Sequence, residues 1–139
     1  MSQENVEIVK EAIERSNRRD YASFDDFYDT GAVWHSREDE PDTGVYHGPE
    51  GIRELTRMWH DTFEEARVEI DQYIDCGDFV VATGFASVRS RGSEMSVREP
   101  YAWAAEVRGG RIVVVREFRN APEAFDALGL SERHPHADP

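Results

Sequence analysis

The first half of the chain repeats its apolar residues at the spacing of an α-helix. Val6, Val9 and Ile13 fall on one helical face, which predicts a first helix near the N-terminus. Asp20 is a suitable N-cap for a second, short helix. The apolar face of that second helix consists of Phe24, Phe27 and Tyr28.

A third helix is predicted after a short strand and a polar loop. Residues 32–35 form an apolar run that is typical of a strand, and residues 36–47 are polar enough to form a loop. Pro49 suits the first turn of the next helix, where its missing N–H costs little. The buried face of this third helix consists of Ile52, Leu55, Trp59 and Phe63.

The second half of the chain changes to the two-residue period of β-strands. Apolar and polar residues alternate over 67–74, and residues 79–88 are apolar on both faces. Two further strands are predicted over 101–107 and 112–119, joined by a Gly-rich turn. Helices followed by antiparallel strands indicate the α+β class. Residues 1–130 are predicted to form one domain, and residues 131–139 a frayed tail.

Composition narrows the possible partners. Among 139 residues, 29 are acidic and 16 basic, which gives a formal charge of −13. Such a negative surface repels phosphate backbones and anionic lipids, so we expect neither nucleic acid nor a membrane as a partner. Cys76 is the only cysteine and cannot form an internal disulfide, which favours a cytoplasmic location. No signal peptide or membrane-spanning stretch is visible.

Four segments resemble one protein family. They are 32–35 (Ala-Val-Trp-His), 46–52 (Tyr-His-Gly-Pro-Glu-Gly-Ile), 109–114 (Gly-Gly-Arg-Ile-Val-Val) and 124–130. Together they are similar to the SnoaL-like polyketide cyclase family, within the nuclear-transport-factor-like superfamily that includes ketosteroid isomerase. The resemblance implies a curved, mostly antiparallel sheet wrapped around three N-terminal helices, a cone-shaped α+β barrel. It also implies a homodimer through the outer sheet face, an apolar small-molecule ligand and no cofactor.

The resemblance to ketosteroid isomerase breaks down at the catalytic positions. The isomerase has an Asp base at the end of the first strand, where this chain has His35. Its two oxyanion donors fall, by spacing, on Ala12 and Ala102, which cannot donate a hydrogen bond. The resemblance therefore argues against steroid isomerisation by that mechanism.

His35 is the first candidate for chemistry. Histidine titrates near neutral pH, so it can remove or return a proton without a large pKa shift. If Val33 packs in the core, strand alternation also turns His35 inward. The alternative is a hydrogen-bonded histidine in the wall of the pocket with no catalytic task.

Glu117 and Arg119 are the second candidates. They share a strand face with Val113 and Val115, and we expect this face to line the pocket. Placed at the open end of the cone, the two charges would orient a substrate or stabilise developing charge. The alternative is a structural ion pair at the rim, and a register slip of one residue would turn Phe118 inward instead.

The remaining predicted site residues form the pocket wall. Tyr28 and Trp59 supply aromatic surface, while Ala102 and Val115 leave room for a ligand. Small residues in the middle of strands have a second interpretation, because they also let a helix approach the sheet closely. Tyr101 and Trp103 alternate away from Ala102, so we expect them on the outer, interface face. No metal site is predicted, because His47 and His60 lack partners at ligand spacing.

Three functions remain open at this point. The first is a cofactor-independent isomerase, cyclase or hydrolase acting on an apolar carbonyl, hydroxyl or epoxide compound, with His35, Glu117 and Arg119 as its catalytic residues. The second is a non-catalytic domain that binds an apolar ligand. The third is a dimeric interaction module with a filled cone, whose contacts would be Tyr101, Trp103, Phe85 and Phe118.

Overall fold

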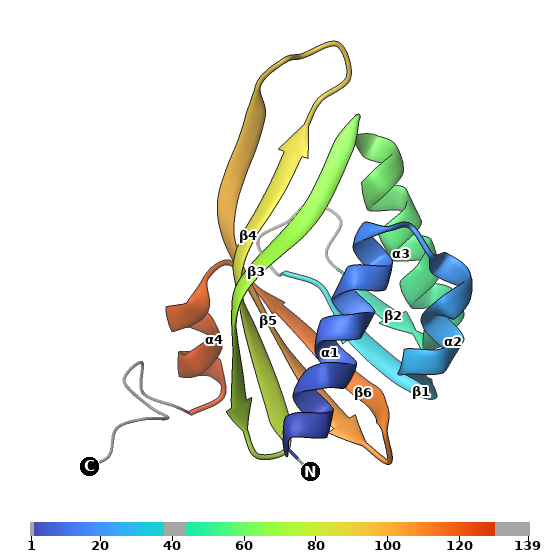
Figure 1. Cartoon of the computed structure of the whole chain (residues 1–139), viewed down its shortest axis with the longest axis vertical. Helices are drawn as coiled ribbons and strands as arrows, with labels where there is room; N and C mark the ends of the chain where they lie inside the picture. The colour runs from blue at the N-terminus through green and yellow to red at the C-terminus, as the bar shows by residue number, and fades with distance from the viewer. Residues whose placement is uncertain (1, 38–43, 130–139) are drawn as a thin grey trace.

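A computed structural model describes residues 2–37 and 44–129, and shows helices packed against one curved sheet (Figure 1). The predicted tail, 131–139, lies outside the described residues. The helical elements are α1 (Ser2–Asn17), η1 (Tyr21–Ser23), α2 (Phe24–Phe27), α3 (Gly48–Thr62) and α4 (Ala121–Ala127). The strands are β1 (Tyr28–His35), β2 (Val45–His47), β3 (Glu65–Cys76), β4 (Phe79–Arg89), β5 (Ser96–Arg108) and β6 (Arg111–Phe118).

The sheet is six-stranded, with the order β2-β1-β6-β5-β4-β3. Every neighbouring pair is antiparallel except β1 and β6, which run parallel. Helices α1, α2 and α3 cover one face, and α4 packs on the other (Figure 1). The predicted α+β class and curved, mostly antiparallel sheet are confirmed, although Tyr28 begins β1 rather than extending the second helix. No described helix has both the length and the apolar character required to cross a membrane.

The bend of the long strands has a local cause at Gly84. Pairing between β3 and β4 shifts between Ile70 and Gln72, so Asp71 is an extra residue on β3. Such a bulge bends a strand and increases its twist. Gly84 lies opposite this bulge, and a Cβ there would come within 2.0 Å of the Glu69 carbonyl oxygen. Only glycine allows the two backbones to approach this closely.

Asn17 attaches the end of α1 to β3. Its side-chain amide donates to the Val68 carbonyl oxygen at 2.8 Å, and its amide oxygen accepts from the Val68 N–H at 2.9 Å. The two bonds are the pair that a neighbouring strand would make with this residue. They fix the end of α1 beside the inner face of the sheet.

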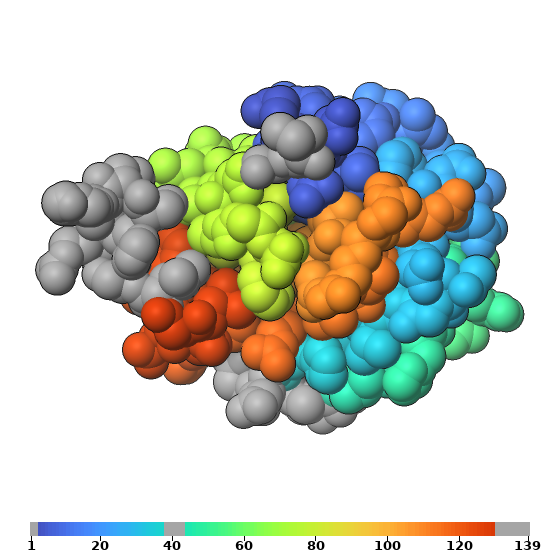
Figure 2. Space-filling view, turned by 90° about the horizontal axis from the view of Figure 1, so that it is seen from below, coloured from blue at the N-terminus to red at the C-terminus, as the bar shows by residue number. Residues whose placement is uncertain are grey.

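Two apolar clusters lie on opposite faces of the sheet. The larger cluster lies under the first three helices and includes Val9, Phe24 and Ile52. The smaller lies under α4, where Ala102 and Ala104 face the helix. At the end away from the β4–β5 hairpin, the β3–β4 and β5–β6 turns lie side by side (Figure 2). The two turns therefore lie together at this end of the sheet, and Val107 donates its N–H to the Asp78 carbonyl oxygen there.

We predict that Gly84→Ala destabilises the protein by about 3 kcal/mol, because the new methyl group collides with backbone that cannot move without undoing the bulge. The matched control is Gly31→Ala in β1, where a Cβ would lie 3.4 Å from Asp29 Oδ2, an ordinary contact. Urea unfolding should show a change within about 0.5 kcal/mol for the control. Equal stability of the two variants would contradict the assigned cause of the bend.

Candidate functional site

A cavity of about 430 Å³ lies between the inner face of the sheet and helices α1 and α3. Its volume falls within the range of pockets that hold small organic molecules. The wall is mostly apolar, with a few polar groups. The residues that line it are Ile13, Ser16, Tyr28, Trp34, Ser36, Arg37, Leu55, Thr56, Met58, Trp59, Thr62, Phe63, Val68, Ala86, Val88, Val97, Glu99, Tyr101, Trp103 and Glu117.

Strand alternation on β5 decides what the sheet contributes to the cavity. Val97, Glu99, Tyr101 and Trp103 all line it, at successive odd positions of one strand. Trp103 pairs with Glu117 on β6, so the deepest of these side chains lies level with that carboxylate. The inner face of β5 therefore runs from an exposed valine at the mouth to a buried tryptophan inside.

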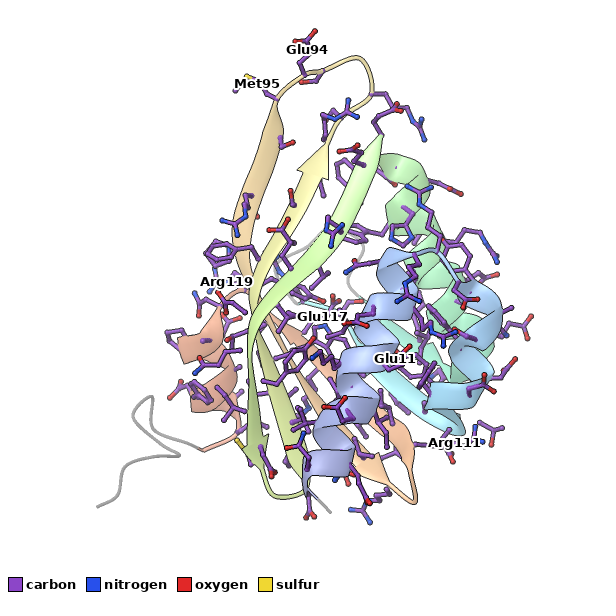
Figure 3. All side chains as sticks on the ribbon, viewed as in Figure 1. Glu11, Glu94, Met95, Arg111, Glu117 and Arg119 are labelled. Carbon is purple, nitrogen blue, oxygen red and sulfur yellow. The ribbon has the colours of Figure 1, made fainter. Side chains whose placement is uncertain are left out.

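Glu117 places a carboxylate inside this aromatic wall. Its Oε1 accepts a hydrogen bond from Trp34 Nε1 at 3.0 Å, and its Oε2 accepts one from the Tyr101 hydroxyl. Figure 3 shows Glu117 directed toward the helical side of the sheet. Glu117 is also one of the residues that line the cavity. The carboxylate is thus oriented by its neighbours and accessible from the cavity.

Tyr28 supplies a neutral hydroxyl to the same cavity. The side chain is 3% exposed and packs between the rings of Phe24 and Trp34. Burial raises the pKa of Tyr28 far above its usual value, and the negative charge of Glu117 raises it further. Within the described parts of the chain, none of the hydrogen bonds uses the Tyr28 hydroxyl. Tyr28 therefore stays protonated and can donate to a ligand.

Comparison with protein families identifies the family to which this chain belongs. Residues 9–115, more than half of the chain, match the SnoaL-like domain. The chain belongs to the SnoaL-like domain family. The family resemblance predicted from the four sequence segments is therefore confirmed. None of the curated proteins matches this SnoaL-like sequence.

Solved structures show the same fold at low sequence identity. A candidate SnoaL-like polyketide cyclase from Jannaschia sp. CCS1 is 16% identical, with a TM-score of 0.72 over 84% of this chain and 85% of that one. TerC, co-crystallised with polyporic acid, is 18% identical, with a TM-score of 0.74 over 84% and 92%. A ketosteroid isomerase-like protein from Catenulispora acidiphila in complex with trimethylamine is 17% identical, with a TM-score of 0.71 over 90% and 94%.

His35 does not face the cavity of this SnoaL-like domain. Trp34 and Ser36 line it, so strand alternation turns His35 to the other face, where it lies level with Arg116 of β6. The expected inward orientation of His35 is wrong, because it assumed that Val33 packs in the core. Val33 is only half-buried, whereas Trp34 is buried.

Arg119 also lies outside the cavity. The strand β6 ends at Phe118, so the alternation that places Glu117 inward does not continue to Arg119. Figure 3 shows Arg119 on the α4 side of the sheet. Its guanidinium donates to the Glu123 carboxylate from Nε at 3.0 Å and from Nη2 at 2.8 Å. Glu117 lines the cavity as predicted, but Arg119 does not join it there.

Two of the four predicted wall residues line the cavity and two do not. Tyr28 and Trp59 line the cavity as predicted. Ala102 instead faces α4, which is the second interpretation of small residues in mid-strand. Val115 points to the inner side but is fully buried among core residues below the cavity. The expectations that Ala102 and Val115 contact a ligand directly are therefore corrected.

Several lining residues were assigned to the wrong face or not considered from the sequence. Tyr101 and Trp103 line the cavity rather than the outer face, and Tyr101 also donates a hydrogen bond to Glu117. Glu99 lies on the same face and is not among the predicted site residues. The alanine pair Ala102 and Ala104 is the sequence feature that indicates the correct faces of β5. A helix that follows the last strand packs closely on the sheet only where the side chains beneath it are small. The described residues contain no group of three or more His, Cys, Asp or Glu side chains that could hold a metal ion.

His60 is a fully buried histidine behind the cavity wall. Its Nδ1 lies 2.6 Å from the Tyr21 hydroxyl, and its Nε2 has no hydrogen-bond partner. Burial lowers the pKa of His60, and the positive charge of Arg19 lowers it further. The neutral imidazole is therefore the form that the folded protein accommodates.

We predict that the free energy of unfolding falls as the pH drops from about 6.5 to 5, by up to about 1.4 kcal/mol per pH unit. The unfolded chain binds the proton of His60 at a higher pH than the folded chain, so acid favours unfolding. Urea unfolding at several pH values should show a smaller slope for His60→Asn. His47→Gln, which changes an exposed histidine in β2, should keep the native slope. An unchanged slope in His60→Asn would exclude this assignment.

Proposed function

We propose that this SnoaL-like domain catalyses proton transfer on an apolar, carbonyl-bearing small molecule, with Glu117 as the base. One observation carries the proposal: a carboxylate oriented by Trp34 and Tyr101 opens into a ligand-sized cavity. A base enclosed by aromatic side chains is shielded from water, which strengthens its electrostatic interactions with a bound substrate. TerC, which has the same fold, was co-crystallised with polyporic acid, and this supports a small organic molecule as the ligand.

The proposed chemistry uses two side chains. Glu117 removes a proton from the carbon beside the carbonyl group, and the electron pair of that C–H bond moves onto the carbonyl oxygen. The Tyr28 hydroxyl, kept protonated by burial, donates a hydrogen bond to this oxygen and stabilises its charge. Returning the proton at another carbon gives isomerisation. Attack of the new carbanion on a second carbonyl of the same molecule forms a C–C bond, and the resulting alkoxide takes the proton from Glu117, which gives cyclisation.

A second candidate is a domain that binds an apolar ligand without changing it. The predominance of apolar and aromatic side chains in the wall favours this candidate, because such walls bind ligands by burial alone. The two candidates differ in whether Glu117 transfers a proton. Ligand recovered unaltered after incubation, together with stabilisation of the fold, would favour binding alone.

We still propose the outer face of the sheet as the homodimer surface, but fewer aromatic residues lie on it than the sequence predicts. Tyr101 and Trp103 face the cavity and cannot contribute to it. Phe85 remains on the outer side, with the Arg98 guanidinium 4.0 Å from its ring centroid, whereas Phe118 is partly buried against the cluster under α4. The proposed dimer therefore uses the part of the sheet beside α4.

The base is tested with 5-nitrobenzisoxazole, which opens when a base removes its ring C–H proton. The N–O bond breaks as the nitrile forms, so the single product is the coloured 2-cyano-4-nitrophenolate, and the base holds the proton. We predict that the protein accelerates this reaction and that Glu117→Gln lowers the rate by about 100-fold, the usual contribution of a positioned base. Tyr28→Phe should lower it by about tenfold through loss of one hydrogen bond to the developing oxyanion.

Glu94→Gln is the matched control, because it makes the same charge change at the exposed tip of the β4–β5 hairpin. Its rate should equal that of the native protein. Circular dichroism should confirm that all three variants remain folded. A rate in Glu117→Gln equal to the native rate would remove Glu117 as the base and leave ligand binding as the function.

A further inference from the structure

A second carboxylate, that of Glu99, lines the cavity closer to its mouth than Glu117. Glu99 lies on the inner face of β5, between Val97 at the rim and Tyr101 inside. Its partner across the sheet is Ala86 of β4, whose small side chain leaves space above the sheet. Glu99 is exposed, as expected for a side chain at the opening.

Register fixes how far apart the two carboxylates are. Glu117 pairs with Trp103, and Trp103 lies four residues beyond Glu99 on the same strand. With a rise of about 3.4 Å per residue, the two backbone levels are separated by about 14 Å along the strand. One small charged group cannot contact both carboxylates at this distance. The cavity therefore has two separate acidic positions, an inner one and an outer one.

The outer carboxylate has no counter-charge of its own. Among the described residues, none makes a hydrogen bond or an ion pair with Glu99. The neighbouring Arg98 points to the opposite face of β5, where it pairs with Glu69 at 2.9 Å. Arg37 also lines the cavity but makes no ion pair with Glu99. A cationic ligand would supply the charge that the protein does not.

The helical wall adds groups that attract cations. Trp59 and Phe63 line the cavity at the C-terminal end of α3, which ends at Thr62. Ring faces, tryptophan above all, attract ammonium groups, and the C-terminus of a helix carries partial negative charge. Figure 1 shows this end of α3 near the start of β3, on the same side as the extended β4–β5 hairpin. The net charge of −13 further favours the approach of a cation.

We infer that the mouth of the cavity is a recognition site for a protonated amine, formed by Glu99, Trp59 and Phe63. The inference rests on the proposed function in one respect, because it places the reacting carbonyl of the same molecule beside Glu117. The substrate class is then an amino ketone whose amine is several bonds from the reacting carbon. The inner carboxylate acts on this molecule, and the outer one selects it.

The test uses two probes of nearly identical shape. One is 6-(dimethylamino)-1-phenylhexan-1-one, whose amine is protonated at pH 7. The other is 7-methyl-1-phenyloctan-1-one, in which a CH group replaces the NH⁺ group. Isothermal titration calorimetry at low salt should give about tenfold tighter binding of the amine to the native protein, as expected for one partly solvated charge pair. The preference should fall as salt is added.

Two variants test whether Glu99 causes the preference for the amine probe. Glu99→Gln should reduce the tenfold preference to about twofold or less while leaving the affinity for the neutral ketone unchanged. Glu94→Gln removes the same charge from the hairpin tip, away from the cavity, and should retain the full preference (Figure 3). Equal affinities of the two probes for the native protein, absence of amine binding up to millimolar concentration, or a full preference in Glu99→Gln would each overturn the amine site.

The amine site and the proposed function can fail separately. Loss of activity toward 5-nitrobenzisoxazole in Glu117→Gln, combined with equal binding of the two probes, would support the base and refute the amine site. A Glu99-dependent amine preference, combined with no dependence on Glu117, would support the amine site in a protein that only binds its ligand.

Discussion

The close backbone contact between Glu69 and Gly84 is the constraint on which the rest of this SnoaL-like domain depends. It accommodates the extra residue on β3 and bends the longest strands of the sheet. Flat sheets pack poorly against helices, and bulges are one way in which a sheet acquires its curvature. On the inner face of this curved sheet, the aromatic residues of β5 and the helices α1 and α3 enclose a cavity of about 430 Å³.

Those aromatic residues have two roles at once. Their rings provide the bulk of the wall, while the polar edges of Trp34 and Tyr101 hold the Glu117 carboxylate. A carboxylate in an apolar space is costly unless donors compensate the water that it loses. Because the donors come from wall residues, orientation of the charge requires no additional polar side chains. Tyr28 remains neutral beside it for the same reason, since burial and the nearby negative charge both oppose its ionisation.

The fold followed from the sequence because helical and strand periods are properties of each segment. Which strand face turns inward is a different kind of information, since a shift of one residue exchanges the two faces. The pairing of β5 with β6 shifts between Glu106 and Val107, so Val113 is an extra residue on β6. The residues of β6 before and after Val113 therefore do not follow one continuous alternation. The alternation on β5 predicts Ala102 inward and Tyr101 outward, whereas α4 covers Ala102 and Tyr101 lines the cavity. Glu117 was placed correctly, whereas the phase of His35 depended on a packing choice between Val33 and Trp34 that the pattern alone does not make.

The pair of bonds between Asn17 and Val68 also has a consequence for how copies of the molecule meet. β3 is an outermost strand, and its free N–H and C=O groups form a template on which a strand from another molecule could add. The Asn17 amide occupies one rung of that template, so an incoming strand cannot pair continuously along it. This side chain therefore interrupts the exposed edge of β3 at one position, which hinders edge-to-edge pairing with a second molecule.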